Sequence, residues 1–244
     1  MRNLLLKISY NGKNYHGYQV QKNAITVQKV LQQQIEKLLK HKVELKGCSR
    51  TDTGVHANEY FASFKTENKI TCNKLVLGLN AILPADIAAK DCEEKPLNFH
   101  ARYSVKSKEY VYKLLNSKCP DPINNGLVYW YKWPLVVTNL NNLAQSFVGT
   151  HNFKGFCAEP NKRTDFTRTI FYFDVFKIND IIYFRVSGDG FLYKMVRIMV
   201  GTLIEYCKKN KTKEELMQLI ENRKRSLTAK PMPPEGLYLN KVIY

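Results

Sequence analysis

The chain has 244 residues, 44% of them hydrophobic and 24% charged, which is ordinary for a folded protein with one large domain or two smaller ones. Its 38 Lys and Arg residues against 21 Asp and Glu give a formal charge of +17, which favours polyanionic partners such as nucleic acid. The excess of Lys (29) over Arg (9) is also what a biased nucleotide composition produces, so charge alone does not prove RNA binding.

The first hundred residues alternate between strand and helix patterns. Thr26 is a predicted N-cap, followed by apolar residues at helical spacing up to residue 39, and Pro84 ends the second predicted helix. The predicted elements, in chain order, are a strand at residues 4–10, a turn at 11–14, a helix from 27 to 39, short strands at 43–45 and 60–64, a helix at 74–82 and a strand at 87–92.

The rest of the chain shows the same mixture. Residues 167–178 and 181–186 predict a β-hairpin, and Thr212 with Glu215 forms a capping-box pattern for the last helix. The other predicted elements are a strand at 104–115, a helix at 140–147 with Gly149 as its C-cap, a helix at 191–207 and a strand at 241–244. The order predicts an α+β fold of two similar halves, residues 1–100 and 101–244, with strands in a mostly antiparallel sheet and helices on one face.

Several other classes of protein are disfavoured. The six cysteines form no CxxC pair, and their spacing fits neither a zinc site nor a compact disulfide framework. The N-terminus lacks the apolar run of a signal peptide, and the most apolar stretch, residues 191–207, carries three charges and is too short to span a bilayer. We therefore expect reduced thiols in a cytoplasmic protein with no membrane partner.

Residues 49–57, Ser-Arg-Thr-Asp-Thr-Gly-Val-His-Ala, form the most informative segment. They place Asp52 in a polar turn with Arg50 before it, and no helical or strand periodicity accounts for the pattern. An aspartate near glycine often serves only to hydrogen-bond its own turn, and that interpretation stays open for Asp52. His56 has no second His or Cys at metal spacing nearby, which indicates a structural role in holding the loop.

The triplet Asp52-Thr53-Gly54 also matches the aspartic-protease motif. Those enzymes need two facing aspartates, and the chain has no second Asp-Thr-Gly or Asp-Ser-Gly triplet. A homodimer supplies two copies only in chains much shorter than this one. The protease interpretation is therefore disfavoured.

Two other segments carry candidate functional residues. Arg197 lies in the most apolar predicted helix, where it must either snorkel to water or pair with a carboxylate, and pairing with Asp52 would keep that group ionised. Lys108, Tyr110 and Tyr112 share one face of a predicted strand. A cation interleaved with aromatic rings suits nucleic acid, although packing in the core is the usual role of a strand tyrosine.

Taken together, these segments resemble the TruA family of tRNA pseudouridine synthases over nearly the whole chain. The similarity extends beyond the aspartate motif at residues 50–57 to blocks that occur in the family's order. These blocks are residues 10–12, 17–21, 26–28, 80–87, 99–102, 108–112, 149–153, 191–197 and 236–239.

The resemblance implies an enzyme without cofactor or metal that isomerises uridine to pseudouridine in RNA. It assigns Asp52 as the nucleophile, Tyr110 as the tyrosine that packs against the target base, and Arg197 as the partner of the aspartate. Arg50 would occupy the space vacated by the flipped nucleotide or contact its phosphate, and Lys108 with Tyr110 would bind substrate. Flipping is required because C1′ and C6 are shielded in a stacked helix.

The resemblance also implies a substrate and an assembly. The expected substrate is the anticodon stem-loop of tRNA at positions 38, 39 and 40, held in the basic cleft of a homodimer, with the active site in the cleft between the two halves of the chain. Residues 208–230, with eight Lys and Arg against three Glu, suit that binding, or form a solvated helix face. Ser49, Tyr18 and Asn11 depart from the family's usual residues without removing a proposed catalytic group. The alternative function is a non-catalytic RNA-binding protein on the same scaffold.

Overall fold

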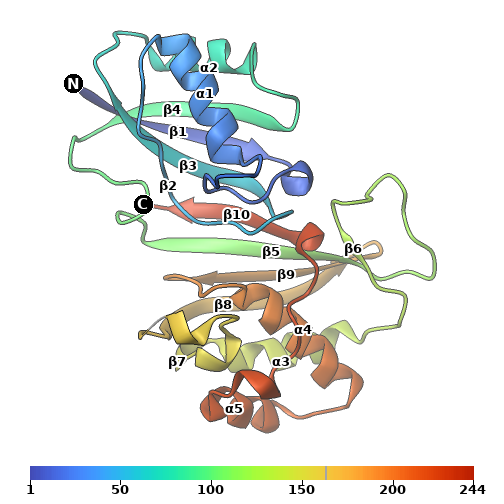
Figure 1. Cartoon of the computed structure of the whole chain (residues 1–244). Coiled ribbons are helices and arrows are strands. Elements are labelled where there is room, and N and C mark those ends of the chain that lie inside the picture. Colours follow the sequence, from blue (N-terminus) through green and yellow to red (C-terminus); the bar gives the residue numbers. More distant parts are fainter. Residues whose placement is uncertain (163) are drawn as a thin grey trace. The chain divides into compact units, whose positions relative to one another are not determined.

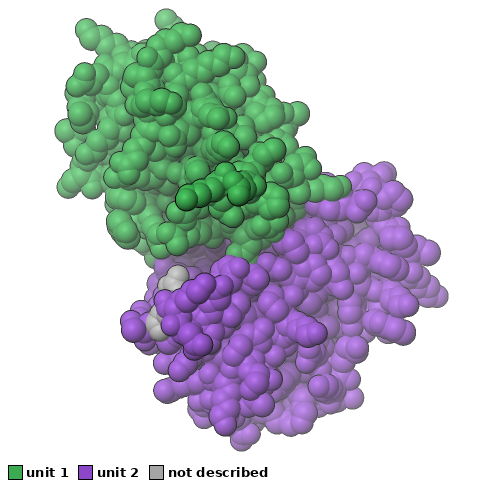
Figure 2. All heavy atoms as spheres, in the orientation of Figure 1, with its two compact units in different colours: residues 1–106, 238–244 green, residues 107–237 purple. Residues whose placement is uncertain are grey.

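The computed structural model describes residues 1–162 and 164–244, which form two compact units. Unit 1 comprises Met1–Lys106 with Tyr238–Tyr244, and unit 2 comprises Ser107–Leu237 (Figure 2). The division predicted from the sequence lies near residue 100, with the whole C-terminus in the second half. In the structure the last strand belongs to unit 1, because Tyr238 and Leu239 pair with His56 and Ala57.

Unit 1 is a sheet covered by two helices. Strand β1 lies between β3 and β4 and pairs antiparallel with both, while β10 runs parallel to β3. The elements of unit 1 are β1 (Arg2–Tyr10), α1 (Val27–Leu39), β2 (Lys46–Gly47), β3 (His56–Thr66), α2 (Cys72–Asn80), β4 (Ile87–Lys95) and β10 (Leu237–Ile243). Figure 1 shows α1 and α2 together over this sheet.

The local reasons for these elements agree with the sequence patterns. The hydroxyl of Thr26 accepts from the Lys29 amide, as expected for the cap of α1, and Thr71 caps α2 in the same way. The apolar stripe of α1 is buried, and Leu38 packs 3.0 Å from where a Cβ of Gly78 on α2 would lie. The central strand β1 is buried at the consecutive residues Leu4, Leu5 and Leu6, so side chains on both of its faces are covered.

Unit 2 contains mainly antiparallel strands and, among its described residues, the three α-helices α3, α4 and α5. The strands pair in the order β5, β9, β8 and β7, with the short β6 parallel to β5. The elements of unit 2 are β5 (Ser107–Leu115), β6 (Tyr129–Trp130), α3 (Val137–Ala144), β7 (Gly149–Asn152), β8 (Thr167–Ile178), β9 (Ile181–Gly188), α4 (Met195–Lys208) and α5 (Lys213–Asn222). The predicted α+β class with mostly antiparallel strands is confirmed.

Several predicted boundaries were wrong. Helix α4 begins at Met195 rather than 191, because Lys194 adopts a left-handed conformation (φ 58°) and ends the preceding loop. Gly149 does not cap α3. It has a φ of 107° and is the first residue of β7, a strand that the sequence patterns did not predict. The capping box of Thr212 and Glu215 is present as predicted.

Candidate active site

Asp52 lies in the loop that joins β2 to β3 and is half-buried. The loop turns at this residue, since the Val55 amide donates to the Asp52 carbonyl over 3.2 Å and Gly54 has a φ of 78°. Arg50, two residues earlier, is exposed. The turn therefore presents an acid and a cation from a short, sharply folded segment.

The loop is fixed on both sides of Asp52 by the end of β1 and by the segment between β1 and α1. The buried Thr51 hydroxyl lies 2.8 Å from the Tyr10 hydroxyl, and the Thr51 carbonyl accepts from the Tyr18 amide over 3.2 Å. The Gly54 amide donates to the Tyr15 carbonyl over 3.2 Å. These contacts hold the residues flanking Asp52, so the carboxylate extends from a braced backbone.

Two glycines permit that close approach. A Cβ on Gly12 would lie 2.0 Å from the Val55 carbonyl oxygen, and one on Gly17 would lie 2.4 Å from the Thr51 carbonyl oxygen. Gly17 also has a φ of +80°, a conformation that other residues adopt only with strain. The glycines of the opening segment are therefore required by the backbone that supports Asp52.

His56 has a structural contact, as predicted. Its Nδ1 accepts from the Gly12 amide over 3.0 Å, so that nitrogen carries no proton. The ring is 1% exposed and stacks on Tyr238 with centroids 4.6 Å apart. His56 therefore ties the start of β3 to the glycine segment and to the C-terminal strand.

Two stacked tyrosines support the loop at Ser49. Tyr18 and Tyr60 are buried with ring centroids 4.1 Å apart, and the Tyr60 hydroxyl donates to the Ser49 carbonyl over 2.5 Å. Burial raises the pKa of both hydroxyls well above the ordinary value, so both remain neutral. Sequence reasoning noted Tyr18 only as a departure from the family and missed its packing role.

In unit 2, Tyr110 lies on β5 opposite Val186 of β9. The residue is 7% exposed, and its ring meets Phe191 edge to face with centroids 5.1 Å apart. Lys108 on the same strand is half-buried and pairs with Gly188. The strand thus places both predicted substrate-binding residues beside the loop that leads into α4.

Arg197 is buried in α4 with an exposed fraction of only 9%. Its Nε donates to the Met232 carbonyl over 2.6 Å, and the Met232 amide donates back to the Arg197 carbonyl over 3.1 Å. The residue is therefore buried, and its Nε bonds a backbone carbonyl of its own unit, which disfavours the snorkelling alternative. Asp52 belongs to unit 1 and Arg197 to unit 2, and their pairing stays a prediction.

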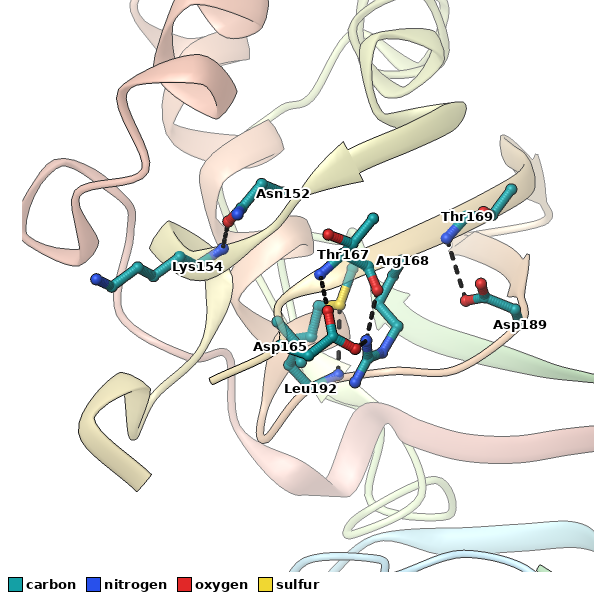
Figure 3. A network of polar contacts seen from close by, with 9 residues as sticks. Asn152, Lys154, Asp165, Thr167, Arg168, Thr169, Asp189 and Leu192 are labelled. Carbon is teal, nitrogen blue, oxygen red and sulfur yellow. Dashed lines mark hydrogen bonds and ion pairs between the residues drawn. The ribbon is translucent and has the colours of Figure 1, made fainter. Parts of the chain in front are cut away.

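A polar network holds the loop between β9 and α4 (Figure 3). Asp189 exchanges two hydrogen bonds with Thr169, its amide donating to the Thr169 carbonyl and its Oδ1 accepting from the Thr169 amide, both at 3.1 Å. Asp165 caps the start of β8 by accepting from the Thr167 amide (2.9 Å) and from Arg168 Nη1 (3.0 Å). The network fixes the entry to the segment that carries Phe191, and no sequence signal had pointed to it.

Within residues 1–162 and 164–244, no group of three or more His, Cys, Asp or Glu side chains is arranged to hold a metal ion. Across the same residues, no helix has both the length and the apolar character needed to cross a bilayer. All six cysteines are free thiols.

Comparison with known proteins gives a consistent family. A model described as tRNA pseudouridine synthase matches residues 7–104 and 143–244. The chain is 42% identical over 245 residues to "tRNA pseudouridine synthase A" of Thermoanaerobacter sp. (strain X514) and 41% identical over 244 residues to that of Acetivibrio thermocellus, covering all of both chains in each case. Among solved structures, a Cbf5–Nop10–Gar1 complex aligns with a TM-score of 0.39 and 13% identity, covering 96% of this chain and 57% of that one.

Proposed function

Because the chain belongs to the TruA family of tRNA pseudouridine synthases, enzymes that isomerise uridine in tRNA, we propose that it acts on the anticodon stem-loop at positions 38, 39 and 40 with Asp52 as nucleophile. The observation that carries the assignment of Asp52 is its place in the structure. It is a half-buried carboxylate on a turn whose neighbours are braced by Tyr10, Tyr15 and Tyr18. A turn aspartate needed only for its own backbone would not require such support.

The isomerisation exchanges one glycosidic bond for another. The C1′–N1 bond breaks, the uracil rotates while it is held, C5 bonds to C1′, and the C5 proton leaves as N1 gains one. A carboxylate beside the ribose serves direct attack on C1′, addition at C6 and the glycal route alike. Braced placement matters because holding reactants in the right geometry supplies much of a rate enhancement.

We assign the remaining residues from their environments. Tyr110, with its ring against Phe191, packs on the target base, and the buried Arg197 pairs with Asp52, as the family resemblance implies. Exposed Arg50 and half-buried Lys108 contact RNA phosphates. We further propose that the protein forms a homodimer and acts on tRNA in the cytoplasm.

Tritium release from tRNA that carries 5-³H-uridine tests the catalytic assignment. Asp52→Ala should abolish release while tRNA binding largely survives, since the backbone contacts of the loop are made by its neighbours. Thr53→Ala, an exposed position in the same turn, is the matched control and should keep its activity. Turnover retained in Asp52→Ala would refute the role of Asp52.

The alternative, a non-catalytic RNA-binding protein, predicts no release from the wild-type protein on any tRNA. Mapping pseudouridine in tRNA from cells with and without the gene checks the positions. If pseudouridine is lost only at positions other than 38–40, the substrate assignment is wrong, but the assigned activity stands.

A further inference from the structure

The segment that joins β5 to α3, residues 116–136, contains both tryptophans of the chain. It lies between the two stretches matched by the family model and contains none of the proposed catalytic residues. Figure 1 shows it as a long excursion from the end of β5 that returns through β6. We call residues 116–136 the tryptophan segment.

Despite its length, the tryptophan segment is anchored at its base. Asn116 Nδ2 donates to the carbonyls of Tyr131 (3.0 Å) and Trp133 (2.8 Å), and the Tyr131 amide donates to the Leu115 carbonyl (2.8 Å). Trp130 pairs with Leu115 through β6 and donates its indole N–H to the Ser117 carbonyl over 3.0 Å. The two indoles are therefore displayed from a fixed backbone, which lowers the entropy lost on binding.

Both indoles face water to an unusual degree for their size. Trp133 is 55% exposed and Trp130 is 37% exposed. Large aromatic side chains normally bury most of their surface, so a pair held in solvent on an anchored segment marks a binding surface. Because the indole N–H of Trp130 is already satisfied by Ser117, what remains for a partner is mainly the ring surface.

The charges around the rings indicate the chemistry of the partner. The Lys132 ammonium lies 4.8 Å from the centroid of the Trp133 ring, and Lys118 is exposed on the same segment. The single acid of the segment, Asp121, is occupied within it by the Ile123 amide (3.0 Å) and by Asn124 Nδ2 (2.5 Å). Exposed aromatic rings beside unopposed lysines match single-stranded nucleic acid, whose bases stack and whose phosphates attract cations.

We propose that Trp130 and Trp133 form a stacking platform for unpaired nucleotides of the tRNA substrate, with Lys132 contacting the adjacent phosphate. The proposal rests on the function proposed above and adds a substrate contact outside the catalytic residues. Such a contact strengthens substrate binding and leaves the chemical step unchanged.

Intrinsic fluorescence tests the proposal on the unmodified protein. Since both tryptophans lie in this segment, emission excited beyond the tyrosine absorption reports on it alone. Titration with unmodified tRNA should quench the emission, and the midpoint of the quenching should equal the midpoint of tRNA binding. The variants Trp130→Phe and Trp133→Phe each remove one indole and so show how much of the quenching comes from each ring. N-acetyltryptophanamide mixed with the same RNA corrects for absorption by the RNA.

Kinetics supply the second arm. Trp133→Ala should raise KM for tRNA by about 10-fold, the size of one lost base–aromatic stack, with kcat unchanged, and Trp133→Phe should recover most of the loss. Leu77→Ala on α2 removes a similarly exposed apolar side chain (71% exposed) and is the control, expected to match wild type.

The outcomes separate this proposal from the proposed function. Wild-type turnover with an unchanged KM in Trp133→Ala and no quenching overturns the platform alone. Absence of wild-type turnover overturns the proposed function, while the fluorescence arm still reports on tRNA binding. An emission change that depends on protein concentration without RNA would show that the segment contacts a second protein copy and would overturn the RNA assignment.

Discussion

Gly17→Ala should disable the enzyme through the backbone of the Asp52 loop. The new Cβ would lie 2.4 Å from the Thr51 carbonyl oxygen, about 1 Å closer than the 3.4 Å at which ordinary contact begins. Gly17 lies in the segment that braces the loop through the Tyr18 amide, so the clash displaces Thr51, and Asp52 follows it in the chain. A misplacement of this size costs on the order of 100-fold in catalysis.

The substitution should also lower the free energy of unfolding. An alanine at a φ of +80° is strained by roughly 1–3 kcal/mol, before any contribution from the displaced loop. Gly149→Ala is the matched control, because it carries similar strain at a φ of +107° while its nearest neighbour, His151 Nε2, is 3.4 Å away. We expect both variants to lose stability but only Gly17→Ala to lose activity.

The assays are tritium release at saturating tRNA for kcat and urea unfolding for stability. If Gly17→Ala folds and retains wild-type kcat, then the brace between Gly17 and Thr51 does not position the catalytic group. If Gly149→Ala loses as much kcat as Gly17→Ala, backbone strain in general, rather than the Asp52 loop, accounts for the loss.

Three further predictions concern Arg197, Tyr10 and the salt dependence of tRNA binding. Arg197→Met should reduce kcat more than tRNA affinity, and Arg197→Lys should not restore it, because a lysine lacks the planar Nε donor that binds the Met232 carbonyl; normal kcat in either variant contradicts this. Tyr10→Phe should cost about 1 kcal/mol of unfolding free energy and lower kcat by releasing the Thr51 hydroxyl, as checked by urea unfolding with Tyr103→Phe, an exposed position, as control. The logarithm of tRNA affinity should fall linearly with the logarithm of salt concentration, and a flat response would refute binding through phosphate contacts.

The sequence predicted those features that depend on short-range patterns. Thr26 and Thr212 were identified as helix caps because a cap hydroxyl bonds an amide only three residues away. The α+β class followed from the alternation of 2-residue and 3.6-residue periods. The aspartate loop was found because its polar residues fit neither period.

Features that depend on backbone conformation or distant contacts were not predicted. The helical pattern in the sequence covers residues 191–207, yet α4 begins only at Met195 because Lys194 adopts a left-handed conformation. The last strand joins unit 1 because it pairs with β3, a contact across about 180 residues that no local signal encodes. Strand β7 was missed because only four residues, held by β8, define it.

The same distinction explains which parts of the candidate site were visible. Asp52 and Arg197 carry chemistry in their own side chains, so a sequence shows them directly. Their supports are the hydroxyls of Tyr10 and Tyr60 and a carbonyl of Met232, groups that are ordinary wherever they occur and become informative only through the residue they touch. Substitution of Tyr10 or Gly17, which support the loop, should therefore cost more unfolding free energy than substitution of the exposed Arg50, two residues before Asp52.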